Sequence, residues 1–133
     1  RTRYNLLYNN IKRCRMVKPE FDWGEEFETF LNSLSTKEEA QFRALIDRVE
    51  NTDLQDSIRK ERVKKLDDDI YELRSQTNDH WLRGCYFQIQ GTEYYITHGF
   101  SKKTNRTPTR EIRRAKAVKK AYWSARIKRR NDK

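Results

Sequence analysis

The amino-acid sequence predicts an α+β domain with its helices against one face of a small antiparallel sheet, in the order two N-terminal helices, sheet and C-terminal helix. Its 133 residues match the length of one typical domain. Apolar residues recur at helical spacing in two early segments and one late segment, and aromatic and β-branched residues are concentrated between them. Short links join the central runs, which favours a three-stranded antiparallel meander.

The two N-terminal helices have separate start signals. The first covers residues 25–34 and has three glutamates in its first turn, where the helix macrodipole favours negative charge. The second is predicted to begin at Thr36, with Thr36 as N-cap and Glu39 three positions later, the spacing of a capping box. The apolar stripe of this second helix is Phe42, Leu45, Ile46 and Val49.

The segment before these helices allows more than one interpretation. Residues 1–15 are either a short helix or an extension upstream of Met16, the one methionine. Residues 16–21 are a candidate extra N-terminal strand, which Pro19 would restrict to an edge or an irregular strand. We therefore divide the chain into an extension over 1–15, a domain over 16–123 and a basic tail over 124–133.

The central and C-terminal elements follow from composition and turn residues. Residues 51–69 are polar and carry no clear signal, whereas residues 70–74, 81–90 and 93–100 have the composition of strands. Pro108 ends the loop after the third strand, and Thr109 is a candidate cap for the last helix. The apolar face of that helix is Ile112, Ala115, Val118, Tyr122 and Ala125.

The net charge of +10 is concentrated at the two ends of the chain. Residues 1–18 contribute +6, residues 19–73 contribute −8, residues 74–100 are neutral and residues 101–133 contribute +12. Such asymmetry indicates a polyanionic partner, and a merely solvated or disordered basic tail is the alternative. The acidic zone either contacts a basic partner segment or keeps that face of the domain in solution.

Several protein classes are excluded by composition. No apolar run is long enough to cross a membrane, and the first residues lack the apolar stretch of a secretory signal. Two cysteines do not make a disulfide framework, so we expect free thiols in the cytoplasm. We expect no metal and no other cofactor, because Asp67, Asp68 and Asp69 have no His or Cys cluster beside them.

An ordered set of motifs resembles the phage-derived HigB-like branch of the RelE/ParE toxin superfamily. The matching pieces, in order, are Lys65-Leu66, Tyr71-Glu72-Leu73-Arg74, Arg83 with Tyr86-Phe87, Gly99-Phe100-Ser101-Lys102-Lys103-Thr104, Pro108 and Glu111-Ile112-Arg113-Arg114-Ala115. They cover roughly residues 63–118, and residues 27–34 resemble the first helix of the family more weakly. Each piece alone is unspecific, and the ordered set is specific.

This resemblance implies a RelE-like fold and the toxin of a type II toxin–antitoxin system. Such toxins are mostly ribosome-dependent endoribonucleases that cleave mRNA and thereby inhibit translation and growth. The implied partners are the ribosome, mRNA and a cognate HigA-like helix-turn-helix antitoxin, with operator DNA bound only through that antitoxin. No membrane partner is expected.

RNA cleavage through the substrate 2′-hydroxyl needs proton transfer and stabilisation of the charge on the phosphorane. Our catalytic candidates are Arg74 and Arg83, on adjacent predicted strands, and Lys102 and Lys103, which follow the third; a meander could bring all four to one face or end of the sheet. Arg83 and Lys103 are assigned to the phosphate, whereas Arg74 is either a second clamp or a structural strand residue. His98 is a candidate general acid or base, and its alternative is a strand-face histidine hydrogen-bonded to the backbone.

Further basic residues would hold the RNA backbone through phosphate contacts. The candidates are Arg106, Arg110, Arg113, Arg114 and Lys119, with a solvated helix face as the alternative. Tyr86, Phe87, Tyr94 and Tyr95 could stack on bases, although strand alternation assigns half of them to the core.

Two other function classes compete with the nuclease. One is a non-enzymatic ParE-like toxin that inhibits DNA gyrase, and the other is a basic nucleic-acid-binding module. The Gly-Phe-x-Lys-Lys segment at residues 99–103 and Arg83 favour the nuclease.

Overall fold

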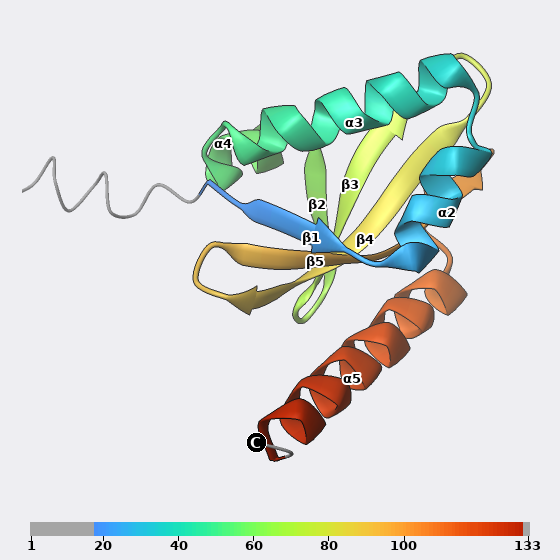
Figure 1. Ribbon diagram of the computed structural model, residues 1–133. Helices are drawn as coiled ribbons and strands as arrows, with labels where there is room; N and C mark the ends of the chain where they lie inside the picture. Colours follow the sequence, from blue (N-terminus) through green and yellow to red (C-terminus); the bar gives the residue numbers. More distant parts are fainter. Residues whose placement is uncertain (1–17, 132–133) are drawn as a thin grey trace, which may run out of the picture.

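The computed structural model describes residues 18–131 and shows a mixed α+β domain (Figure 1). The expected α+β class is confirmed, while residues 1–15 and the start of the candidate strand at 16–17 lie outside the described part. The elements in order are β1 (Glu20–Trp23), α2 (Glu25–Ser33), α3 (Thr36–Glu50), α4 (Leu54–Arg59), β2 (Val63–Asp67), β3 (Ile70–Gln76), β4 (Trp81–Gln90), β5 (Glu93–Lys102) and α5 (Thr109–Asn131).

The five strands form one sheet in the order β1-β5-β4-β3-β2. Strands β2 to β5 are an antiparallel meander, and β1 pairs in parallel with β5. The expected three-stranded meander is incomplete, because β2 adds a fourth strand to it. Strand β1 lies before the helices, as the candidate N-terminal strand does, but it covers Glu20–Trp23 rather than residues 16–21. Strand β2 was not predicted from the sequence. It lies at the sheet edge, where Lys64 and Lys65 are exposed, so its residues do not alternate between apolar and polar.

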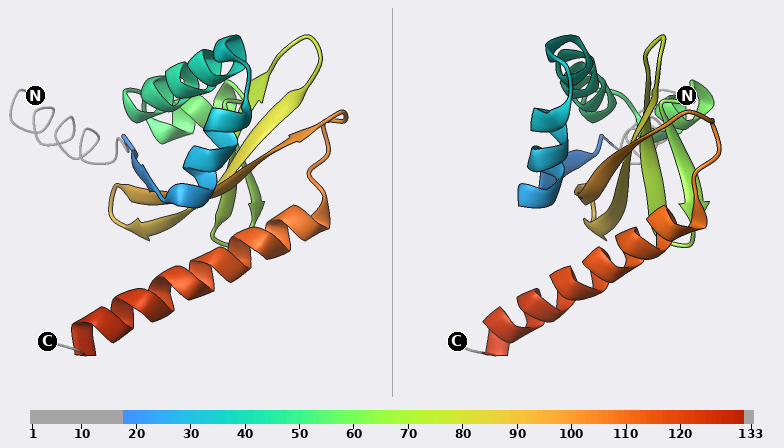
Figure 2. Two further views of the ribbon diagram at one scale, coloured as in Figure 1. Left: turned by 45° about the vertical axis from the view of Figure 1, so that its right-hand side comes forward. Right: turned by 90° about the vertical axis from the view of Figure 1, so that its right-hand side faces the viewer.

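Helices cover both faces of the sheet, so the expectation that they lie on one face is wrong (Figure 2). Helices α2 and α3 pack on one face, over a core that includes Phe27, Phe42, Leu73, Leu82, Tyr86 and Ile96. Helix α5 packs on the other, over Ile70, Cys85 and Phe87. Successive side chains of a strand point to opposite faces, and β4 is apolar on both, so both faces need a cover.

The N-cap of α3 lies one residue before the predicted cap, Thr36. The N-cap is Ser35, whose Oγ accepts from the Glu38 backbone N–H at 3.2 Å, and the Glu38 carboxylate accepts from the Ser35 N–H at 3.3 Å. Ser35-Glu38 and Thr36-Glu39 have the same spacing and residue classes. Only the path of the chain between α2 and α3 selects the first pair.

A β-bulge changes which residues of β5 face α5. Cys85 pairs with His98 but Tyr86 pairs with Ile96, so Thr97 is the extra residue on β5. Before the bulge, Tyr95 packs toward α5, and after it His98 and Phe100 do, while Lys102 contacts the loop that precedes α5. The bulge therefore brings Lys102 to the same face as Arg83 of β4.

Ion pairs join α5 to the rest of the domain. Lys119 Nζ lies 3.2 Å from Asp69, Lys116 pairs with Asp67, and Arg114 pairs with Glu26. Residues 124–131 continue this helix, although their composition predicts a basic tail. Within residues 18–131, none of the helices is long and apolar enough to cross a membrane.

Candidate functional site

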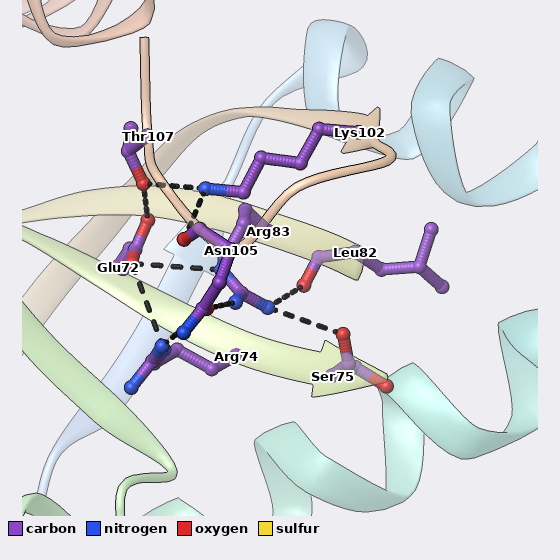
Figure 3. A network of polar contacts seen from close by, with 8 residues as sticks. All are labelled: Glu72, Arg74, Ser75, Leu82, Arg83, Lys102, Asn105 and Thr107. Atoms are coloured by element: carbon purple, nitrogen blue, oxygen red, sulfur yellow. Dashed lines mark hydrogen bonds and ion pairs between the residues drawn. The ribbon is translucent and has the colours of Figure 1, made fainter. Parts of the chain in front are cut away.

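A cluster of charged and polar side chains occupies the α5-facing side of the sheet where β3 and β5 end and β4 begins (Figure 3). Arg74 and Arg83 are directly opposite each other on neighbouring strands. Glu72 is two residues before Arg74, on the same face of β3, and Lys102 ends β5. The structure therefore brings together three of the five predicted catalytic residues, Arg74, Arg83 and Lys102.

Arg83 is almost completely buried, with 1% of its surface exposed. Its Nη1 donates to the backbone carbonyls of Leu82 at 3.0 Å and Ser75 at 3.3 Å, which fixes the plane of the guanidinium. Burial lowers the pKa of Arg83, and the negative charge of Glu72 opposes that change. An arginine normally stays protonated in proteins, so this is a rigid cation held inside the fold.

Asn105 bridges the two arginines. Its Oδ1 accepts from Arg74 Nη2 at 2.7 Å and from Arg83 Nη2 at 2.7 Å. Asn105 is exposed and lies in the loop between β5 and α5. Two cationic donors thus converge on a single neutral oxygen at the surface of the domain.

Glu72 compensates the positive charge of the cluster from below. It is 1% exposed, and its Oε1 lies 3.5 Å from Arg83 Nε and 3.7 Å from Arg74 Nε. Its Oε2 accepts from Thr107 Oγ1 at 2.5 Å, which ties the loop after β5 to the sheet. The carboxylate therefore orients both guanidinium groups and the loop that carries Asn105.

Lys102 contacts the same loop from β5. Its Nζ donates to the Asn105 carbonyl at 2.8 Å and to Thr107 Oγ1 at 3.0 Å. Partial burial lowers the pKa of Lys102 to about 8, an effect that Glu72 opposes and that Arg83 and Arg74 reinforce. Lys102 is thus an amine that exchanges a proton near neutral pH, next to two fixed cations.

His98 lies away from this cluster, beneath the first turns of α5. Its imidazole is 0% exposed, Nδ1 is 2.9 Å from Thr97 Oγ1, and Nε2 is 3.3 Å from Glu111 Oε2. Burial and Arg114 lower the pKa of His98, while Glu111 raises it. The ring contacts a side chain of its own strand and one of α5, and it does not reach the surface that Arg74 and Lys102 share.

The remaining predicted residues divide into exposed and paired cations. Lys103, Arg106, Arg110 and Arg113 are exposed, whereas Arg114 and Lys119 form the ion pairs to Glu26 and Asp69 described above. Arg106 lines a groove of about 520 Å³ with Lys64 and Lys65 of β2. A basic groove thus continues from the arginine cluster between the loop and the sheet edge.

The aromatic candidates for base stacking are mostly core residues. Tyr86, Phe87 and Tyr94 are at most 5% exposed, and half-buried Tyr95 packs on Tyr122 of α5. Strand alternation and the two covered faces together explain why none of the three buried rings is open to solvent.

Sequence reasoning missed several members of the cluster. Glu72 could have been found, since it lies two residues before Arg74 in a strand and so shares its face. Asn105 and Thr107 reach the site only through the fold of the loop. Trp81 and Glu61, which line a pocket beside the arginines, had no sequence signal that separated them from ordinary strand and loop residues.

The arrangement suits an anionic ligand with a proton to exchange. Two converging guanidiniums bind phosphate oxygens, and an amine with a pKa near 8 transfers protons.

A family model, described as phage derived protein Gp49-like (DUF891), matches residues 29–120. These residues include every member of the cluster. A search of curated proteins finds no match to the chain.

Proposed function

The chain belongs to the phage-derived Gp49-like family, a RelE-like toxin family of toxin–antitoxin systems, and from this premise we propose that it is the toxin of a type II system. More specifically, we propose that the protein is a HigB-like, ribosome-dependent endoribonuclease that cleaves mRNA. Partners would be the ribosome, mRNA and a cognate helix-turn-helix antitoxin, through which alone the pair would contact operator DNA.

The observation that carries this proposal is the convergence of Arg74 and Arg83 on one oxygen of Asn105, at 2.7 Å each. An amide oxygen carries no charge, whereas a phosphate oxygen at the same place would bring a negative charge to both guanidiniums, the acceptor that arginine binds with matching geometry. Asn105 is exposed on a loop and can turn away without disturbing the sheet. The cluster is therefore built around the position of an anionic oxygen.

The proposed reaction uses the neighbouring 2′-hydroxyl as the nucleophile. Neutral Lys102 accepts the 2′-hydroxyl proton, the 2′-oxygen bonds to phosphorus, and the bond from phosphorus to the 5′-oxygen breaks. The products are a 2′,3′-cyclic phosphate and a 5′-hydroxyl end, whose proton comes from water or from Lys103. Arg74 and Arg83 stabilise the negative charge that grows on the phosphorane oxygens, a contribution that preorganised donors supply well. His98, beneath α5, has no role in this scheme.

The charge distribution supports the proposed partners. Lys103, Arg106, Arg110 and Arg113 form an exposed basic set beside the cluster, suited to RNA phosphates. Helices α2 and α3, on the opposite side of the sheet, carry seven of the sixteen acidic residues of the zone 19–73. A basic segment of the antitoxin could bind there while RNA occupies the other side.

The test is induction of the gene in growing cells, followed by primer extension on cellular transcripts. We expect growth arrest and new 5′ ends with the wild type, and a loss of both with Arg74→Ala or Lys102→Ala. Lys37→Ala, an exposed change on α3, is the matched control and should behave as the wild type. Arrest with intact transcripts and altered DNA supercoiling would instead indicate gyrase inhibition, and absence of arrest would overturn the toxin assignment.

A further inference from the structure

A pocket of about 230 Å³ adjoins the arginine cluster, and part of its lining consists of residues that the proposed chemistry leaves unused. Arg74 and Arg83 form one side of the pocket, and Trp81 and Glu61 contribute an aromatic ring and a carboxylate. Two cations suffice to bind a phosphate. An aromatic ring and a carboxylate beside them can in addition bind the base of a nucleotide.

Trp81 supplies the stacking surface. It is only partly buried, and the Arg83 guanidinium carbon lies 5.3 Å from the centroid of its ring. This contact holds the indole beside the cation that would bind the phosphate. Bases of single-stranded RNA stack on such aromatic and guanidinium planes.

Glu61 is placed in the pocket by a backbone conformation that disfavours it. Its φ is +58°, the left-handed region, at the position after the C-cap of α4 where helices usually have glycine. The Glu61 N–H donates to the Ile58 carbonyl at 3.0 Å, and the Arg62 N–H donates to the Ser57 carbonyl at 2.9 Å, which is the Schellman pattern. A glycine would satisfy this turn at lower cost, so the turn does not explain the carboxylate.

The Glu61 side chain also has no compensating partner. Among residues 18–131 it makes no ion pair or side-chain hydrogen bond, although the pocket contains two arginines. A carboxylate beside a phosphate site would repel an RNA backbone unless it accepts hydrogen bonds from another part of the nucleotide. The donors that RNA offers are the N–H groups on the edge of a base and the ribose 2′-hydroxyl, and the proposed reaction uses the 2′-hydroxyl next to the bound phosphate as its nucleophile.

We propose that this pocket holds a guanine base of single-stranded RNA, stacked on Trp81 with its Watson–Crick edge on Glu61 and its phosphate on Arg74 and Arg83. Guanine is the base whose Watson–Crick edge carries two adjacent donors, N1–H and N2–H, which match the two oxygens of one carboxylate. Adenine, cytosine and uracil each place at least one acceptor lone pair against the carboxylate. The inference deepens the proposed function and rests on it for the identity of the ligand as RNA.

The test measures binding of labelled 2′-O-methyl tetranucleotides to the full chain by fluorescence anisotropy. These RNAs lack the nucleophile, so binding is read without cleavage and without ribosomes. We expect UUGU to bind about tenfold more tightly than UUAU, the discrimination typical of a two-hydrogen-bond base contact. Trp81→Ala should weaken binding of both RNAs about tenfold, because each loses its stacking surface.

Glu61→Gly separates recognition from folding. It removes the carboxylate but supplies the residue that the turn prefers, so the fold should be at least as stable, while the preference for UUGU falls to less than twofold. Glu93→Gln, an exposed carboxylate at the far end of β5, should leave the preference unchanged. A preference below twofold in the wild type, or one retained in Glu61→Gly, would overturn the inference.

The outcome is distinguishable from that of the nuclease proposal. If transcripts are cut in cells but wild-type protein does not discriminate UUGU from UUAU, the guanine pocket is wrong and the nuclease stands. If UUGU binds with the expected preference but no transcript is cut, the pocket stands and the nuclease is wrong.

Discussion

The buried carboxylate of Glu72 offers the sharpest test of how the arginine cluster is held together. Glu72→Gln keeps the shape of the side chain and an oxygen that can accept from Thr107, and it removes only the charge. Arg83, 1% exposed, then loses the carboxylate with which it forms an ion pair, Glu72, whose Oε1 lies 3.5 Å from Nε. The substitution therefore isolates the electrostatic part of the contact.

The expected cost follows from the geometry. Removing one partner of a buried ion pair typically costs about 3–5 kcal/mol. Here the separations of 3.5 and 3.7 Å from the two Nε atoms are longer than close charge-assisted bonds, and Arg83 keeps three hydrogen-bond acceptors. We therefore expect unfolding free energy to fall by about 2–3 kcal/mol, or the melting temperature by roughly 6–15 °C for a chain of this length.

Urea unfolding followed by circular dichroism measures this effect, because urea does not screen charge as guanidinium does. Glu93→Gln is the matched exposed control, and we expect it to stay within about 0.5 kcal/mol of the wild type. The variant should also lower the pKa of Lys102 below about 8, since Glu72 raises it. A Glu72→Gln protein within about 0.5 kcal/mol of the wild type would refute the assignment of Glu72 as the electrostatic support of the cluster.

Three other predictions use different parts of the structure. If neutral Lys102 is the general base, the rate of cleavage of ribosome-bound mRNA should rise about tenfold per pH unit below about 8 and level off above it. A rate that does not change from pH 6 to 8 would exclude that role, and so would the same pH-dependent rise in Lys102→Arg. Arg106→Gln should reduce the slope of log affinity against log salt for single-stranded RNA by about 0.7, and an unchanged slope would mean that Arg106 contacts no phosphate. Ser35→Ala should lower the unfolding free energy by about 1 kcal/mol, whereas Thr36→Ala, at the originally predicted cap, should change it less; the reverse order would contradict the observed cap.

Local patterns in the sequence were sufficient for most elements of the fold. The strands at 81–90 and 93–100 were predicted because aromatic and β-branched residues flank a short turn, and the structure extends the second only to Lys102. Strand β1 and helix α4 were harder, since four and six residues hold too little periodic signal. Burial by the rest of the domain, rather than propensity, gives these short segments their structure.

The candidate site shows the same division. Arg74, Arg83 and Lys102 were candidates from the sequence, and the structure places them around Asn105. Strand alternation alone assigns Phe100 and Lys102 to a face, but the extra residue at Thr97 decides that this face is the one Arg83 occupies. His98 was a candidate on its chemistry alone, and its complete burial under α5 depends on a helix that begins eleven residues later.

By itself, the sequence determined the elements whose signal is local, the uneven charge and the identities of the basic residues that a phosphate requires. Periodicity, the spacing of capping residues and charge are properties of residues close together in the sequence, so they can be recognised without knowing the fold. Tertiary structure alone decided which face each helix covers, which of two equivalent caps is used, and how Glu72 and Asn105 hold Arg74 and Arg83. Those contacts join residues up to 31 positions apart, and their energies depend on burial and on distances of a few ångströms that no local pattern encodes.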